Sequence, residues 1–128
     1  MTDSIVILPG MKKEIRISRL EVKIKKLKRE LMGLEEMRPG SISKQYNVCG
    51  NPNCKCKAKK NPRKHGPYYQ LSYVHRGRNS SQFIRKEFLA QTRKQVCTYR
   101  KFRKLTDTWV SLALEHAKLS LELEREQQ

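Results

Sequence analysis

The sequence predicts a mainly α-helical protein with a small β-hairpin. Two long helices are expected to form an antiparallel coiled-coil stalk, with a metal knuckle and the hairpin inserted between them at one end. Three features predict this fold class: two series of heptad-spaced apolar residues, a cysteine cluster between them, and an aromatic-rich segment after the cysteines. Only 37% of the 128 residues are hydrophobic, so a large globular core is not available.

The chain divides into four parts of one domain. We expect a loose leader at 1–11, an N-terminal coiled-coil helix at 12–38, a knuckle and β-hairpin at 39–86, and a long C-terminal helix at 87–128. The first helix should stop before Pro39-Gly40, because proline disfavours a helical conformation in the residue before it and glycine releases the chain.

Both helices are predicted from apolar residues that alternate at spacings of three and four, the a/d seam of a coiled coil. The first seam comprises Ile17, Leu20, Ile24, Leu27, Leu31 and Leu34. The second comprises Phe102, Leu105, Trp109, Leu112, His116, Leu119 and Leu123, with His116 expected to be packed or partly exposed. The simplest assembly is an intramolecular antiparallel pair, although seams of this kind also form homodimers or bind a partner protein.

The cysteine cluster predicts one structural zinc ion. Cys49, Cys54 and Cys56 lie within eight residues, and His65 follows in the pattern Cys-x4-Cys-x-Cys-x8-His. Three thiolates and one imidazole would close a tetrahedral shell. His75 or Cys97 could replace His65, or no protein ligand could complete the shell; Cys97 is otherwise expected to be a small buried hydrophobe. The simpler alternative is a basic loop with reduced, unliganded thiols.

The sequence lacks the marks of membrane insertion or export. It has no run of about 18 apolar residues, and no basic region precedes a signal-peptide core at its N-terminus. We therefore expect a cytoplasmic protein without a membrane partner. In a reducing compartment, clustered cysteines hold metal more often than they form disulfides.

After the knuckle, the segment Tyr68–His75 is rich in residues that favour strands. Alternation places Tyr69, Leu71 and Tyr73 on one face, able to pack against the start of the long helix, and Tyr68 on the other. Residues 76–79 read as a turn and 80–85 as the returning strand.

Positive charge is concentrated in the middle of the chain. The formal net charge is +17, and residues 40–104 contain 17 Lys and Arg but only one acidic residue, Glu87. Such a field attracts polyanions, of which nucleic acid is the commonest, and we expect DNA rather than RNA. The expected phosphate contacts are Lys55, Lys57, Lys59, Lys60, Arg63, Lys64, Arg76, Arg78, Arg85 and Lys86, with Tyr68 as a candidate for stacking on a base.

These features favour a nucleic-acid-binding accessory protein over an enzyme. The central module has one carboxylate, no paired acids and no Gly-rich phosphate loop, and a closed ligand set leaves no metal position for water. The alternative is a coiled-coil adaptor protein, in which the zinc site is purely structural and the heptad seams bind a partner helix.

Three runs of the sequence carry a family resemblance: Met37–Gly50 (MRPGSISKQYNVCG), Cys54-Lys-Cys, and Lys64–Tyr73 (KHGPYYQLSY). Over about residues 37–110 the chain resembles a family of short bacterial and archaeal proteins of unassigned function. The resemblance implies helices around a cysteine-containing hairpin. Some members are encoded beside transposases, which implies a link to mobile DNA.

Overall fold

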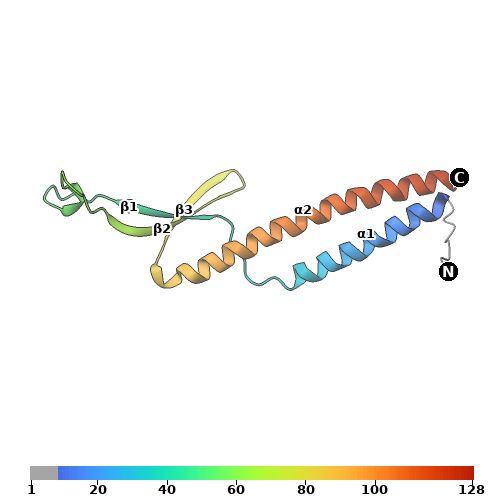
Figure 1. Cartoon of the computed structure of the whole chain (residues 1–128), viewed down its shortest axis with the longest axis horizontal. Helices are drawn as coiled ribbons and strands as arrows, with labels where there is room; N and C mark the ends of the chain where they lie inside the picture. Colours follow the sequence, from blue (N-terminus) through green and yellow to red (C-terminus); the bar gives the residue numbers. More distant parts are fainter. Residues whose placement is uncertain (1–8) are drawn as a thin grey trace, which may run out of the picture. The chain divides into compact units, whose positions relative to one another are not determined.

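The computed structural model describes residues 9–128 of the chain (Figure 1). In chain order its elements are α1 (Pro9–Met32), β1 (Ser41–Asn47), the 3-10 turn η1 (Lys55–Lys57), β2 (His65–His75), β3 (Arg78–Ile84), the 3-10 turn η2 (Lys86–Phe88) and α2 (Leu89–Glu126). The leader predicted at 1–11 lies outside the described residues as far as residue 8, and its last three residues belong to α1.

These elements form two compact units. Among the described residues, the helical unit comprises residues 9–34 together with Lys101–Gln128, and the sheet unit comprises Glu35–Arg100. The fold is thus two helices and a three-stranded antiparallel sheet, which is a larger β component than the hairpin that the sequence predicted.

In the helical unit, α1 and the C-terminal part of α2 run antiparallel. Lys13 near the start of α1 forms ion pairs with Glu122 and Glu126 near the end of α2. Further along α1, the Glu21 carboxylate accepts a hydrogen bond from His116 Nε2 at 3.0 Å. Lys28 Nζ lies 5.2 Å from the centre of the Trp109 ring. Residues later in α1 therefore contact residues earlier in α2, as expected for an antiparallel pair of helices.

The apolar seams are the buried faces of these two helices. Leu20, Leu105 and Leu119 are buried, with 5%, 9% and 4% of their surface exposed. Every other seam residue is half-buried, including His116, as expected from its position in the seam. The spacing of apolar residues correctly predicted which side of each helix is covered.

The end of α1 was predicted incorrectly. The helix stops at Met32, six residues before the expected boundary at 38. Gly33 follows, and its N–H is shared between the carbonyl oxygens of Arg29 (3.1 Å) and Glu30 (3.2 Å). Glycine inside a helix costs about 1 kcal/mol relative to alanine, so the helix ends at the glycine and does not continue to the proline.

The sheet has the order β1-β2-β3, and its first strand was not predicted. β1 pairs antiparallel with β2, from Ser41 opposite Ser72 to Asn47 opposite His65, with an irregularity between Gln45 and Asn47. Five of the seven residues of β1 are polar, so only Ile42 and Tyr46 suggest a strand. β1 forms because β2 supplies a neighbouring edge.

The hairpin between β2 and β3 is tighter than expected. His75 pairs with Arg78, so the turn consists of Arg76 and Gly77 alone, and Asn79 belongs to β3. Both turn residues have positive φ, 50° and 76°. This conformation matches the two-residue type I′ turn, whose twist suits an antiparallel pair.

The core of the sheet unit lies between the sheet and the first turns of α2. Leu71, Ile84 and Val96 are buried, and Tyr69 and Tyr73 pack against them with Ile42. The prediction that Tyr69, Leu71 and Tyr73 share the face covered by the long helix is confirmed. The opposite face of the sheet, which carries Tyr68, is called the outer face below.

α2 begins at Leu89, two residues after the predicted start, because η2 precedes it. The segment before β1 also contacts this part of α2, since the Arg38 N–H donates to the Gln95 carbonyl at 3.1 Å. Within residues 9–128, no helix combines the length and apolar character needed to cross a membrane.

Candidate metal centre

Residues 48–64, here called the knuckle, connect β1 to β2 (Figure 1). Cys49 lies two residues after the end of β1, and His65 is the first residue of β2. Since Asn47 pairs with His65, the sheet itself brings these two side chains near each other. Cys54 and Cys56 come from the reversal of the chain at η1.

Hydrogen bonds around Asn51 shape that reversal. The Asn51 side-chain oxygen accepts from the Asn53 N–H at 3.0 Å, and its carbonyl accepts from the Cys54 N–H at 3.2 Å. The Lys57 N–H then donates to the Cys54 carbonyl at 3.0 Å, closing η1. Asparagine commonly organises turns in this way, which gives the Cys-x4-Cys spacing a local structural cause.

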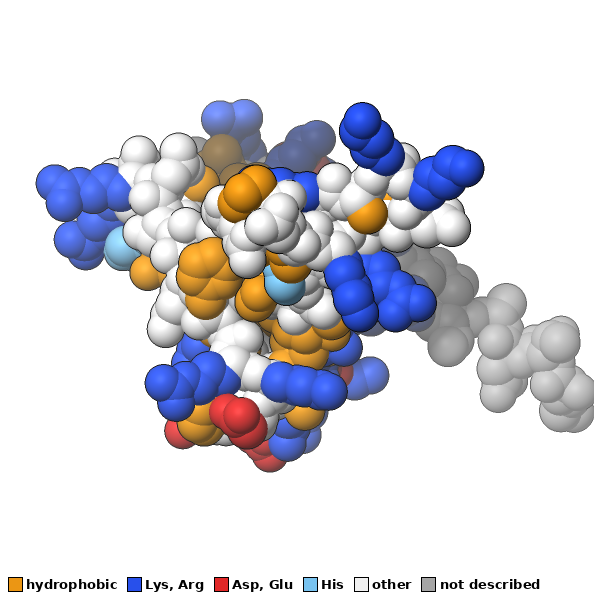
Figure 2. Space-filling model, turned by 90° about the vertical axis from the view of Figure 1, so that its left-hand side faces the viewer, with side chains coloured by type: hydrophobic (Ala, Val, Ile, Leu, Met, Phe, Trp, Pro, Cys, Tyr) orange, Lys and Arg blue, Asp and Glu red, His pale blue; other side chains and the backbone are white. Residues whose placement is uncertain are grey.

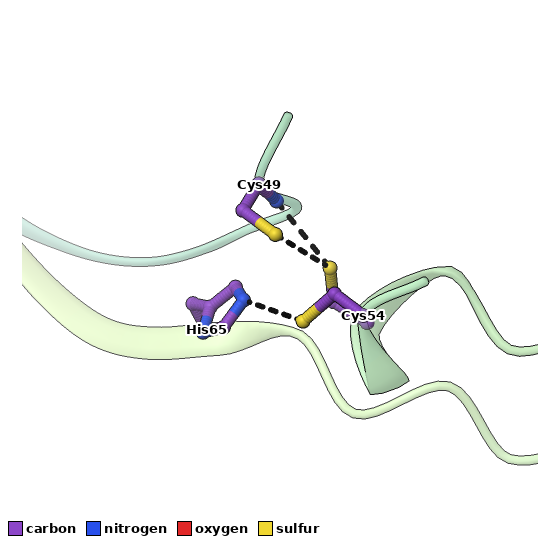
Figure 3. Close-up of side chains that lie close together, drawn as sticks. Cys49, Cys54 and His65 are labelled. Carbon is purple, nitrogen blue, oxygen red and sulfur yellow. Dashed lines mark hydrogen bonds between the residues drawn. The ribbon is translucent and has the colours of Figure 1, made fainter. Parts of the chain in front are cut away.

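The four candidate ligands converge on one point, and each offers one donor atom. The donor atoms of Cys49, Cys54, Cys56 and His65 all lie within 4.8 Å of one another. Cys54 Sγ is 3.1 Å from His65 Nε2 (Figure 3). The Sγ atoms of Cys49 and Cys56 are 3.7 Å apart. Zinc–sulfur bonds of about 2.3 Å put the sulfurs of a tetrahedral site about 3.8 Å apart, which fits the pair.

Burial in the knuckle is restricted to this cluster. Cys56 is 2% exposed, Cys49 and Cys54 are half-buried, and every other residue of the knuckle is exposed, as is His65. The Cys49 N–H also donates to Cys56 Sγ at 3.3 Å, a bond that stabilises a thiolate. The knuckle therefore has no apolar core of its own.

The cluster changes the acidity of its members. A backbone hydrogen bond from Cys56, with help from the neighbouring thiols and His65, lowers the pKa of Cys54 from 9.0 to about 6. A backbone hydrogen bond with Asn51 and then His65 lower the pKa of Cys49. The pKa of His65 is raised by its hydrogen bonds with Cys49 and Cys54.

Cys56 differs from the other two thiols. The backbone hydrogen bond from Cys49 favours its thiolate, but burial and the two neighbouring sulfurs outweigh that bond and raise the pKa of Cys56. Without a metal ion, the cluster thus favours the thiolate of Cys54 and raises the pKa of the neighbouring His65. A cation that replaces the protons would neutralise the crowded sulfurs.

Of the three side chains considered as a fourth donor, the structure brings His65 to the three cysteines. His75 stands at the other end of β2 from His65, about 34 Å away at roughly 3.4 Å per residue. Cys97 lies in α2 and is exposed, so the expectation of a small buried hydrophobe there was wrong. The neighbouring Val96 faces the sheet instead, and successive helix residues point in directions about 100° apart.

The predicted basic residues are all exposed but do not form one patch. Six of them belong to the knuckle: Lys55, Lys57, Lys59, Lys60, Arg63 and Lys64. Arg85 and Lys86 follow β3, at the same end of the sheet as the start of β2. Arg76 and Arg78 lie at the other end of the hairpin. Figure 2 shows Lys and Arg side chains projecting around several hydrophobic side chains on one face.

The outer face holds exposed apolar side chains beside the cluster. Tyr68, Phe83 and Val48 are 44%, 67% and 54% exposed. Together with Asn47, Cys49 and His65 they line a concavity of about 540 Å³. Sequence reasoning identified Tyr68 but not the other two, although alternation along the returning strand would have placed Phe83 on the face opposite Ile84.

Comparison with known proteins identifies the family. No curated protein and no solved structure matches the chain. The model of a family described as a domain of unknown function (DUF6788) matches residues 17–94, a segment that contains all three strands and all four donors of the cluster. The chain therefore belongs to the DUF6788 family.

Proposed function

We propose that Cys49, Cys54, Cys56 and His65 hold one zinc ion. Thiolate and imidazole donors suit zinc, whereas magnesium and calcium prefer oxygen. The separation of 3.7 Å between two sulfurs supports a tetrahedral site without large rearrangement. Four protein donors would complete the shell, so the ion would be structural.

A closed shell also supports a protein that is not an enzyme. Catalytic zinc sites keep one position open for water or substrate. Among the described residues, the cluster has no carboxylate within its set of donors that could act as a base. The ion would instead hold the start of β2 and the basic loop in place.

We propose that the protein binds nucleic acid through the sheet unit, and the charge of that unit is the observation that carries the proposal. Residues 35–100 contain 15 Lys and Arg against three Glu, a formal net charge of +12. The ten predicted phosphate contacts are all exposed. A field of this size raises the local concentration of polyanions and accelerates their association.

DNA is the preferred partner in this proposal, and the activity is that of an accessory protein of mobile elements. The support is the sequence resemblance to proteins encoded beside transposases. Phosphate contacts of this kind do not distinguish DNA from RNA. The affinities of the protein for DNA and for RNA therefore have to be compared directly.

Gel-shift titrations of the full chain with DNA and RNA, single- and double-stranded, test the proposal at two salt concentrations. We expect binding that weakens steeply with salt, because each phosphate contact releases counterions. Reversing the charge of Lys59, Lys60, Arg76 and Arg78 should reduce both affinity and salt dependence. The matched control reverses four exposed charges of α1: Lys23, Lys25, Lys26 and Arg29. Absence of binding at low salt would refute the function.

The adaptor is the second candidate, and it is favoured by the pairing of α1 with α2. We propose that their seams pack as an antiparallel coiled coil, supported by the Lys13 ion pairs and by the hydrogen bond from His116 to Glu21. Exposed apolar residues away from the seams, Val22, Leu114 and Leu121, could receive a further helix. Light scattering would detect a dimer, and a pull-down with the sheet-unit charge reversal would separate the two functions: loss of all partners excludes the adaptor.

A further inference from the structure

The concavity beside the metal cluster has the size of a ligand site. Its volume of about 540 Å³ falls within the range of roughly 300–1,000 Å³ that is common for small-molecule sites. It lies on the outer face of the sheet, opposite the face that packs on α2. The Cys/His cluster forms one wall, because Cys49 and His65 belong to its lining.

Two aromatic rings are exposed in this concavity at a useful spacing. Phe83 pairs with Gln70, which is two residues along β2 from Tyr68, so Phe83 and Tyr68 are diagonal neighbours on the same face. Diagonal neighbours are about 7–8 Å apart. A flat ring held between two others, in contact at about 3.5–4.0 Å on each side, needs the same space.

The electrostatic setting favours a polyanion over a protein partner. From Gly40 to Lys86 the sequence contains no Asp or Glu. Lys64 directly precedes His65, which lines the concavity, and Arg85 follows Phe83 by two residues, just after the end of β3. Protein interfaces are depleted of lysine at their centres, whereas single-stranded nucleic acids bind where basic grooves run beside exposed aromatic rings.

We infer that this concavity binds one unpaired base of a single-stranded nucleic acid, with the base stacked against Tyr68 and Phe83 and the flanking phosphates near Lys64 and Arg85. The inference rests on the proposed nucleic-acid binding and adds the form of the nucleic acid and the residues that hold it. A base inside a duplex is already stacked on its neighbours, so its faces are not available to the rings. The Asn47 amide at the same site can bond to the edge of the base.

Fluorescence anisotropy on the full chain, purified with added zinc, tests the inference. The probes are labelled oligothymidylate and oligouridylate of about 12 nucleotides, a duplex of the same length, and an abasic strand that keeps the phosphates but lacks bases. We expect both single strands to bind more tightly than the duplex and the abasic strand. Phe83→Ala and Tyr68→Ala should each weaken single-strand binding by about 10-fold.

The matched control is Phe88→Ala, because Phe88 is an aromatic residue of similar exposure, 55%, outside the concavity. It should bind like the parent protein, and Phe83→Tyr should restore affinity. Since the phosphate contacts remain, Phe83→Ala should leave the salt dependence of binding unchanged. Zinc content and circular dichroism confirm that each variant is folded.

Different results would contradict the base site or the proposed nucleic-acid binding. Equal affinity for the abasic strand or the duplex, or no effect of both alanine variants, would overturn the base site while leaving nucleic-acid binding intact. If Phe83→Ala instead converts a dimer to a monomer in light scattering without changing affinity for single strands, the concavity is a surface for self-association. Absence of binding to every probe at low salt overturns the proposed function itself.

Discussion

Replacing Cys54 by serine should remove the metal and release the knuckle without disturbing the helices. Structural zinc contributes about 10–16 kcal/mol of apparent binding free energy at neutral pH, or about 2.5–4 kcal/mol for each of four ligands. Cys54→Ser should therefore weaken zinc binding by about 100- to 1,000-fold, since about 1.4 kcal/mol is a factor of ten. Elemental analysis of purified protein should fall from about one zinc per chain towards zero.

The structural consequence should be confined to the knuckle, because Cys56 is its only buried residue. No apolar core remains there to order the loop once the ion is lost. Hydrogen exchange should accelerate at residues 48–64, whereas the helical circular dichroism should persist. The buried leucines of the seams, Leu20, Leu105 and Leu119, do not depend on the ion.

Cys97→Ser is the matched control, since it makes the same chemical change at an exposed cysteine outside the cluster. This variant should keep its zinc and its exchange pattern. The reasoning fails if Cys54→Ser retains zinc with unchanged affinity, or if the metal-free parent protein protects the amides of the knuckle as well as the metal-loaded form does.

Three further predictions follow from particular residues. The rate of Cys54 alkylation in metal-free protein should rise with pH, with a midpoint near pH 6, because hydrogen bonds that stabilise its thiolate lower the pKa. The stabilisation that these bonds give the folded protein is complete above pH 9.0 and is lost as the pH falls through about 6. An alkylation midpoint near pH 9.0 would contradict the geometry. Gly66→Ala should lower the free energy of unfolding of the sheet unit, measured by urea denaturation, by about 1–3 kcal/mol. The reason is that φ of Gly66 is +135° and the added Cβ would lie 2.7 Å from a backbone oxygen of β1. Gly50→Ala is the control, because the space around Gly50 is open. Leu71→Ala removes a side chain that is 1% exposed and should lower the free energy of unfolding by about 2–5 kcal/mol. Val74→Ala, at a residue 64% exposed on the same strand, should change it by less than about 0.5 kcal/mol. Equal effects of the two substitutions would contradict the assigned core.

Periodic features were predicted well because they are local. The alternation of Tyr69, Leu71 and Tyr73 follows from the pleat of any strand, and it placed these side chains on the covered face. The seams of α1 and α2 follow in the same way from the helical repeat. Neither argument needs knowledge of the partner surface.

Features that depend on a distant partner were missed. β1 is mostly polar and exists as a strand because β2 lies beside it, a pairing of residues 18 to 31 positions apart. The sequence placed Phe83 in the returning strand but did not predict its role in a site. Its place beside Tyr68 and His65 depends on the register across the two-residue turn, and a shift of one position would have put it on the other face.

For the candidate metal centre, the sequence by itself determined which donors are present, because only cysteine and histidine residues supply soft ligands in this basic segment. The tertiary structure decided which histidine joins them. His65 and His75 begin and end the same strand, and pairing of Asn47 with His65 brings only the first to the cysteines. The register of β2 with β3 placed the exposed ring of Phe83 beside Tyr68 and the cluster. Ligand chemistry is a property of individual side chains, whereas their convergence is a property of the sheet that holds them.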